Sequence, residues 1–172
     1  MDNTQTLSRD EKINKISSIV RDNPVCMMAT NLQKTPFSVY PMTTLELDDK
    51  GDLIFFTSKK ASPFKEIEKD NRVQLLYANH DKQDYLSVFA HATHILDDVK
   101  LEKLWKPIMN NWFDGKHDPN LVILSVSIVS ADYWITENNI WDSYLQTDNV
   151  GSGESGSINL QNYGDVAYKA EK

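Results

Sequence analysis

Apolar residues fall in short blocks along most of the chain, and these blocks predict β-strands with few helices between them. Turn sequences separate the blocks: DDKG at residues 48–51 favours one hairpin, and residues 79–83 favour a second. Pro41 lies inside a block, which indicates that its strand is at a sheet edge or contains a bulge. We expect strands over residues 25–30, 35–47, 53–56, 72–79, 84–96 and 121–129, with 131–134 prolonging the last strand or opening a turn.

Helical spacing of apolar residues is confined to three segments. The first helix begins at a capping box formed by Ser8 and Glu11, and the second opens on Ser62-Pro63. The third follows Asp97-Asp98, and Pro107 is expected to kink it or to split it in two. Its apolar face is predicted to contain Leu101, Leu104, Trp105, Ile108, Met109 and Trp112.

This succession of elements predicts the fold class. About six strands with few helices between them exclude a doubly wound sheet, which needs regular alternation of strands and helices. A mainly β fold, a small antiparallel barrel with peripheral helices, hides strand edges that would otherwise be exposed. We expect one domain over residues 1–150. Residues 151–172 are interpreted as a flexible linker (GSGESGS, 151–157) and a C-terminal tail, whose final residues either add one short strand or lie over a partner subunit.

Composition and charge narrow the cellular setting. The formal net charge of −7 and the pI near 5.0 disfavour nucleic acid and anionic membranes as main partners. The single cysteine, Cys26, lies in an apolar block that suggests a buried thiol, and it cannot form an internal disulfide. No apolar run approaches the ~20 residues of a membrane span, and the polar amino terminus does not resemble a signal peptide. We therefore expect a soluble, cytoplasmic protein.

One segment, residues 51–77, has the chemistry of a phosphate site. Its pattern predicts a strand, a short loop, a helix and a second strand. The hydroxyls of Thr57, Ser58 and Ser62 and the ammonium groups of Lys59 and Lys60 lie around the predicted start of the helix. Hydroxyls, ammonium groups and the unpaired N–H groups of a helix start all donate hydrogen bonds to an anion. The spacing alone leaves an ordinary solvated turn open as the alternative.

Several motifs of other functional classes are absent from the sequence, which contains no GxxxxGK[ST], CxxC, HExxH or GxSxG. His91 and His94 would face opposite sides of a strand, so we favour surface or satisfied core histidines over metal ligands. Trp105 and Trp112 are interpreted as core or dimer packing, with flavin stacking as the alternative. No residue is assigned a catalytic or metal-binding role.

The order of several motifs resembles one known family. Similarity to the pyridoxamine 5′-phosphate oxidase-like split barrels is carried by Tyr40-Pro41-Met42, Phe55-Phe56-Thr57-Ser58, Ile67, Val73 and Tyr85-Leu86-Ser87-Val88. The general stress protein 26-like branch is resembled by Leu104-Trp105, Trp112-Phe113, Gly115, Asp118-Pro119-Asn120-Leu121 and Tyr133-Trp134. The resemblance covers residues 13–141. It implies a six-stranded antiparallel split β-barrel that forms a homodimer and binds FMN where the two subunits meet.

The resemblance also implies which residues bind the cofactor. The strand along the flavin ring is matched by Tyr40, Pro41, Met42 and Thr43, and the strand end that passes the ribityl chain and phosphate by Phe56, Thr57 and Ser58. The phosphate loop is matched by Lys59, Lys60 and Ser62, and Trp112 is the candidate for stacking. Relatives commonly carry arginine where this chain has Tyr40 and lysine where it has Pro63. Either Lys59, Lys60 or Lys65 substitutes as a point charge, or FMN binds weakly, or a different phosphorylated ligand is used.

The implied function is that of a stress-related, FMN-dependent oxidoreductase in which the flavin accepts hydride or electrons. The C-terminal substrate-binding segment of true pyridoxamine phosphate oxidases is not apparent after Trp141, so that particular activity is not expected. Two alternatives stay open. One is a non-catalytic protein that binds or stores flavin, and the other is a dimeric interaction protein without a cofactor.

Overall fold

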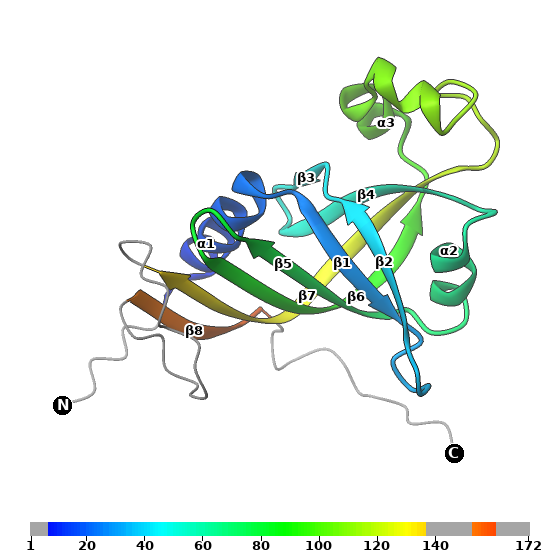
Figure 1. Cartoon of the computed structure of the whole chain (residues 1–172). Coiled ribbons are helices and arrows are strands. Elements are labelled where there is room, and N and C mark those ends of the chain that lie inside the picture. Colours follow the sequence, from blue (N-terminus) through cyan, green and yellow to red (C-terminus); the bar gives the residue numbers. More distant parts are fainter. Residues whose placement is uncertain (1–6, 137–152, 161–172) are drawn as a thin grey trace.

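One curled antiparallel sheet dominates this computed structural model, which describes residues 7–136 and 153–160 (Figure 1). The strands follow the order β2-β1-β5-β6-β7-β4-β3, and β8 pairs with β7 off this path. Their bounds are β1 Val25–Thr30, β2 Ser38–Thr43, β3 Glu46–Leu47, β4 Asp52–Ser58, β5 Arg72–Asn79, β6 Asp84–Ile95, β7 Leu121–Thr136 and β8 Gly153–Asn159. The predicted class, a mainly β antiparallel split barrel, is confirmed.

The strand count differs from the expected six, since the described sheet has eight strands. The block at residues 35–47 forms two strands, because β2 pairs with β1 whereas β3, after Thr44 and Leu45, pairs with β4. The second addition is β8, which lies where the sequence predicted a flexible linker. That interpretation was wrong over Gly153–Asn159: glycine and serine favour strands weakly, but the open edge of β7 pairs with the segment and Ile158 is buried. The division of the chain at residue 150 stays a prediction.

Both predicted hairpins are confirmed. Leu47 pairs with Leu53 across the β3–β4 turn, where Gly51 adopts a positive φ of 88° that side chains disfavour. The second hairpin joins β5 and β6. The pairing of β6 with β7 shifts register between Phe89 and Ala90, where Val129 of β7 is the extra residue, and such a bulge bends the strand around a barrel.

The described helical segments are α1 Arg9–Asp22, α2 Ser62–Ile67, α3 Asp98–Leu104 and the 3-10 segment η1 Pro107–Asn111. The capping box at the start of α1 is confirmed, because the Ser8 N–H donates to Glu11 Oε2 at 2.7 Å. Pro107 splits the expected third helix, since α3 ends before the proline and η1 starts with it. None of the helices in the described ranges is long and apolar enough to cross a membrane.

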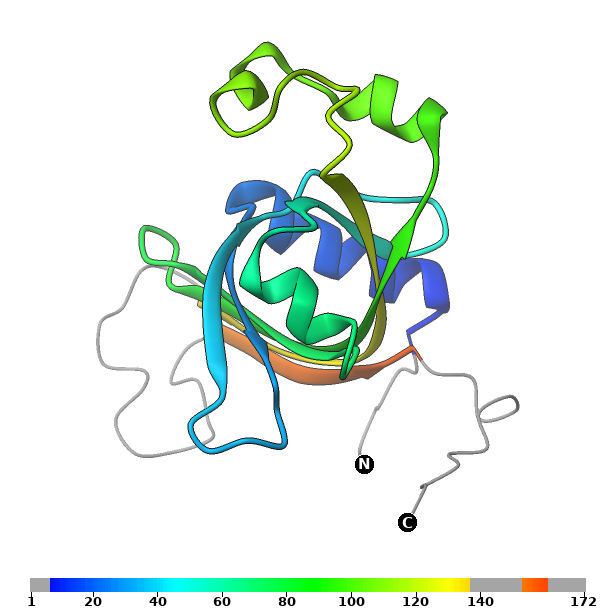
Figure 2. The same ribbon diagram turned by 90° about the vertical axis from the view of Figure 1, so that its right-hand side faces the viewer.

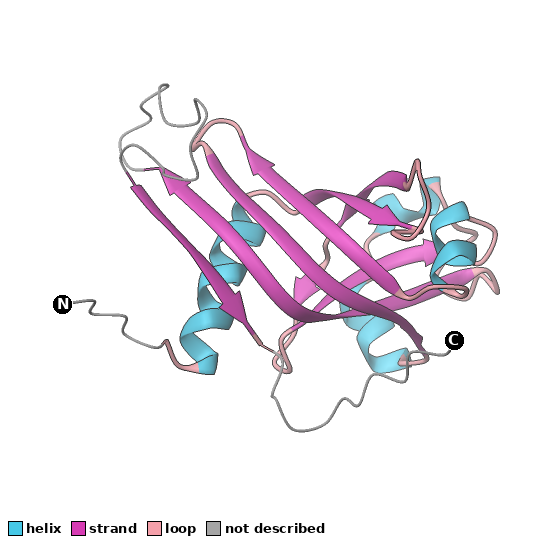
Figure 3. Ribbon diagram, turned by 90° about the horizontal axis from the view of Figure 1, so that it is seen from below, coloured by secondary structure: helices cyan, strands magenta, loops and turns pink. Residues whose placement is uncertain are grey.

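Helices α1 and α2 lie at opposite ends of the barrel (Figure 2). Ile16, Ile19 and Val20 of α1 are buried in one cluster with strand residues such as Phe55 and Leu75. Burying each side chain of this size stabilises the fold by roughly 1.5–3 kcal/mol. In the view along the barrel, α2 lies in front of the opening and α1 behind it (Figure 2). From below, the strands form a curved wall with α1 behind it (Figure 3).

Residues 96–120, which we call the excursion, leave the sheet between β6 and β7 and carry α3 and η1 (Figure 1). Leu104 packs with Ile54 and Ile123 in a small second cluster, apart from the main core. Ion pairs add to this contact: Lys100 Nζ lies 2.7 Å from Asp48 Oδ2, and Lys103 Nζ lies 2.7 Å from Glu46 Oε2. The excursion is therefore fastened to β3 and β4 at its first helix.

Candidate functional site

The strand expected along a flavin ring, β2, is the terminal strand of the sheet. It pairs with β1, and the proline that predicted an edge, Pro41, lies opposite Met27. Its side chains alternate: Tyr40 and Met42 are half-buried, whereas Pro41 and Thr43 are exposed. The four predicted residues of this strand thus present two different faces, one toward the barrel and one toward solvent.

The end of β4 carries the residues expected beside a ribityl chain and phosphate. Phe56 is half-buried and stacks on Trp105 with ring centroids 6.4 Å apart. Thr57 is buried, and the hydroxyl of Ser58 accepts a hydrogen bond from the backbone N–H of Lys60 at 3.2 Å. The turn is anchored to the excursion as well, because the Lys59 N–H donates to the carbonyl of Asn120 at 2.8 Å.

The predicted phosphate loop is a tight turn between β4 and α2. Lys59, Lys60 and Ser62 are exposed, and Lys65 is exposed one helical turn later on α2. Within the described ranges, no ion pair engages any of these three ammonium groups. Pro63 is buried at the first turn of α2, a position where a missing N–H costs no hydrogen bond. The hydroxyl and ammonium groups are therefore available to an anion from solvent.

Glu66 of α2 was not identified from the sequence, and it occupies the centre of this region. Its carboxylate accepts hydrogen bonds from the hydroxyls of Thr30, Ser38 at 3.0 Å and Tyr40 at 3.2 Å. Burial raises the pKa of Glu66, but the three donors and the charge of Lys34 outweigh burial and hold the pKa below its ordinary value. Glu66 is consequently a carboxylate at neutral pH, and it ties β1, β2 and α2 together.

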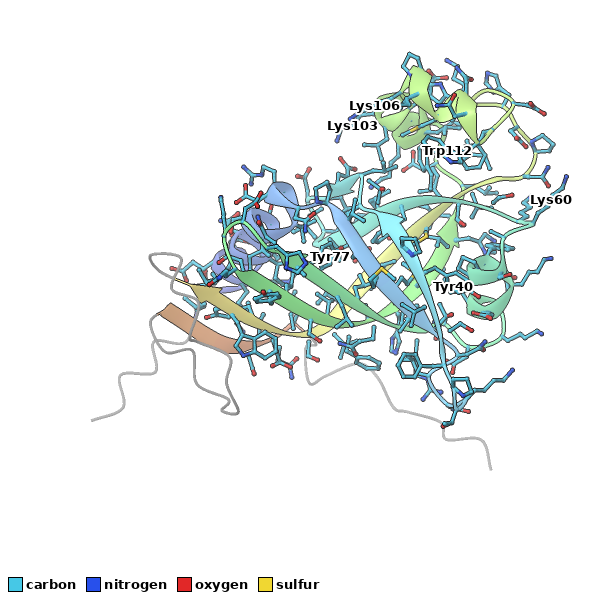
Figure 4. The ribbon with its side chains drawn as sticks, in the orientation of Figure 1. Tyr40, Lys60, Tyr77, Lys103, Lys106 and Trp112 are labelled. Atoms are coloured by element: carbon cyan, nitrogen blue, oxygen red, sulfur yellow. The ribbon has the colours of Figure 1, made fainter. Side chains whose placement is uncertain are left out.

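These contacts bring most of the predicted site to one end of the barrel. Tyr40 points toward α2, and Lys60 lies beyond it at the outer end of β4 (Figure 4). Trp112 lies apart, on the excursion, and is 70% exposed. The prediction that Trp105 and Trp112 share one helical face was wrong, because Pro107 ends the helix between them.

Other candidate groups take structural roles. Cys26 is buried, and burial raises the pKa of its thiol to about 12, which excludes a thiolate nucleophile at neutral pH. Nearby, the hydroxyls of Thr44 and Tyr77 share a hydrogen bond of 2.7 Å. His94 lies at the surface with Nδ1 3.0 Å from Glu68 Oε1. In the described part of the chain, no group of three His, Cys, Asp or Glu residues is placed to hold a metal ion.

Comparison with known proteins adds an independent observation. The family model described as pyridoxamine 5′-phosphate oxidase like matches residues 11–149. Protein bli-3 of Neurospora crassa is 29% identical over 142 residues, which are 76% of this chain and 68% of the relative. General stress protein 26 of Bacillus subtilis is 31% identical over 116 residues, 65% of this chain and 80% of the relative.

The fold recurs in solved structures. One is described as the general stress FMN/FAD binding protein from Xanthomonas citri, and it superposes with a TM-score of 0.63 at 22% identity. The match covers 76% of this chain and 93% of that protein. At this identity, the likeness establishes the shared split-barrel fold.

Proposed function

The chain belongs to the pyridoxamine 5′-phosphate oxidase-like family, and from this premise we propose that it is a homodimeric, stress-related flavoprotein that binds FMN and uses it for redox chemistry. The observation that carries the proposal is the set of hydroxyl and ammonium groups from Thr57 to Lys65 at one end of the barrel, beside the terminal strand β2. The Xanthomonas citri protein, described as FMN/FAD-binding, supports the choice of a flavin.

The phosphate of the cofactor would be bound by the turn between β4 and α2. Thr57, Ser58 and Ser62 supply hydroxyls, and Lys59, Lys60 and Lys65 supply flexible positive charges. These three ammonium groups are exposed, and none forms an ion pair within the described ranges. They therefore suit a phosphate with two negative charges. Tyr40 is held by Glu66, so we assign it a positioning role along the ribityl chain rather than a contact with the phosphate.

The flavin ring would lie along β2. Among the described strands β2 pairs with β1, so alternate backbone N–H and C=O groups along its other edge are open to a ligand. Pro41, Met42 and Thr43 would flank the ring, and Phe56 would cover it on the barrel side. Trp112 would exclude water from the ring if the excursion of one subunit reaches the site of the other.

The homodimer is supported by an exposed apolar face on the outside of β1, β2 and β5. Val25 (48% exposed), Met27 (42%), Val39 (41%) and Leu76 (48%) all lie on it. Met27 is in register with both Pro41 and Leu76, so these side chains form one continuous surface across three strands. Apolar surfaces of this kind on a soluble domain mark protein interfaces. Because this face includes Val39 of β2, the proposed flavin strand would lie beside the proposed interface.

When bound, FMN supplies hydride and electron transfer, and the chain supplies position, charge and exclusion of water. No side chain is proposed as a general acid or base. A second candidate function, a dimeric interaction protein without a cofactor, is favoured by one observation: Glu66 follows Lys65 on α2, and its carboxylate adds a negative charge that opposes anion binding.

Three outcomes of one experiment separate these functions. We expect the purified dimer to bind FMN and to bleach the bound flavin when NADH or NADPH is added without oxygen. Flavin binding without bleaching by either donor contradicts the oxidoreductase assignment and leaves a flavin-binding or storage protein. A colourless protein that FMN cannot reconstitute contradicts both flavin functions and leaves the interaction protein.

A further inference from the structure

A cleft beside the excursion has the composition of a second ligand site. It has a volume of about 540 Å³ and lies between the C-terminal end of α1, the β2–β3 connection and the end of α3. Small-molecule sites in proteins have volumes of this order. We call it the α1–α3 cleft. Its walls contain none of the phosphate-loop lysines discussed above.

Three cations line the α1–α3 cleft, against one carboxylate. Arg21 comes from α1, Lys103 and Lys106 come from the excursion, and the carboxylate is Glu46. Figure 4 shows Lys103 and Lys106 on the same side of the excursion, the side toward β3. The cleft therefore has an excess of positive charge, although the whole chain has a formal net charge of −7.

The single carboxylate is already engaged. Glu46 receives Lys103 Nζ at 2.7 Å and Lys100 Nζ at 3.5 Å, so it has little capacity left to neutralise the other cations. Across residues 7–136 and 153–160, neither Arg21 nor Lys106 lies in an ion pair with a carboxylate. Arg21 Nη2 donates to Ser17 Oγ, another residue of the cleft wall, at 3.3 Å. This hydrogen bond holds the guanidinium at the cleft.

The remaining walls are partly apolar. Val20, Leu45 and Leu104 contribute side chains from α1, the β2–β3 connection and α3, and Thr43 adds a hydroxyl. Inorganic ions gain nothing from apolar walls, whereas an organic anion buries its apolar part there. The complementary ligand therefore has one anionic group and a compact apolar body.

We propose that the α1–α3 cleft binds a small organic anion, a carboxylate or a phosphate monoester, through Arg21 and Lys106. This site shares Thr43 with the proposed flavin strand, but its cations lie apart from the turn proposed for the flavin phosphate, so its occupancy does not depend on flavin. Guanidinium and ammonium groups form charge-assisted hydrogen bonds with either anionic group, so the cleft geometry admits both.

The test is a calorimetric titration of the full-length protein with phenyl phosphate, benzoate and inorganic phosphate. We expect phenyl phosphate or benzoate to bind more tightly than inorganic phosphate, and the tighter of the two identifies the anionic group. Lys106→Gln should raise the dissociation constant about fivefold or more, since it removes a charged hydrogen-bond donor. Lys69→Gln, which removes an exposed charge after α2, should leave the constant unchanged.

Four results would overturn the proposal. The first is no binding of any probe at millimolar concentration, and the second is tightest binding of inorganic phosphate. The third is an equal loss of affinity in Lys106→Gln and Lys69→Gln, which would indicate diffuse charge attraction. The fourth is loss of phenyl phosphate and benzoate binding in protein saturated with FMN, because the cleft would then belong to the flavin site. Both lysines are exposed, so circular dichroism of the two variants should match the parent protein.

Discussion

The phenol of Tyr40 on β2 donates a hydrogen bond to Glu66 Oε1 on α2 at 3.2 Å. The position where the family resemblance implies a basic phosphate ligand is therefore occupied by a donor that is already committed to a carboxylate. This pairing fixes β2 against α2 at the proposed flavin site. It also introduces a negative charge that any bound phosphate must tolerate.

The first prediction concerns that negative charge. Glu66→Gln keeps an acceptor for Ser38 and Tyr40, turns an amide donor toward the Thr30 hydroxyl and removes the charge, so it should tighten FMN binding about two- to tenfold. Quenching of FMN fluorescence measures the affinity. The matched control is Glu68→Gln, which lies on the same segment and pairs with His94 at the surface. Weaker binding by Glu66→Gln would contradict the idea that the carboxylate opposes the phosphate.

The second prediction concerns the apolar outer face of β1, β2 and β5. Leu76→Glu places a charge in the proposed dimer interface and should raise the dimer dissociation constant at least about 30-fold, or roughly 2 kcal/mol. Light scattering after size-exclusion chromatography measures the mass. Ser127→Glu adds the same charge at an exposed position of β7 and should leave the dimer intact. A dimer that survives Leu76→Glu unchanged means that the interface lies elsewhere.

The third prediction follows from the ion pair that fastens the excursion to the barrel. Burial raises the pKa of Asp48, but the hydrogen bonds from Lys100 and the turn N–H groups hold the pKa below 3.8. Burial lowers the pKa of Lys100, and the two carboxylates outweigh it and raise the pKa above 10.5. Both side chains are well covered, with 13% and 15% exposed.

Asp48→Asn keeps the turn acceptor and removes the ion pair, so it should lower the free energy of unfolding by about 1–3 kcal/mol at pH 7. The Asp48 pKa is depressed on folding, so its contribution is present above pH 3.8 and is lost as the pH falls through the folded value. The raised pKa of Lys100 places the other limit above pH 10.5. Urea denaturation from pH 3 to 11 measures the free energy of unfolding over this pH range. The control is Asp49→Asn at an exposed neighbouring position, which should leave the free energy of unfolding unchanged across the range.

The fourth prediction concerns the single cysteine. Cys26 is 1% exposed, and burial raises the pKa of its thiol to about 12, so the native protein should not react with iodoacetamide at pH 8. Mass spectrometry after labelling should find the modified residue only in urea-unfolded protein. Rapid labelling of the native state would show that β1 opens readily, contrary to its buried position between β2 and β5.

Local signals in the sequence were sufficient for most elements of the fold. β1 and β5 have the predicted bounds, because turn residues flank each apolar block. The capping box at Ser8 and the split at Pro107 were predictable from chemistry within a few residues. β8 was not, because its pairing depends on the free edge of β7, and its own glycines and serines carry no strand signal.

The residues of the candidate site were likewise only partly predictable from the sequence. The hydroxyls and lysines of residues 57–62 were identified because they adjoin one another along the chain. Glu66 was missed because its partners Thr30, Ser38 and Tyr40 are 26 to 36 residues away, and only the barrel brings them together. The arrangement of β1 between β2 and β5 is equally non-local, and with it the apolar face proposed for the dimer.

The most direct test of the account is a calorimetric FMN titration of the parent protein and of the triple variant Thr57→Ala, Lys59→Ala, Lys60→Ala. We expect one FMN bound per subunit, and an affinity lower by about tenfold or more in the variant, since it loses a hydroxyl and two charged donors. Circular dichroism should show that both proteins have the same fold. Equal FMN affinity in the two proteins would contradict the proposed phosphate site, and no FMN binding by the parent protein would contradict the flavoprotein assignment itself.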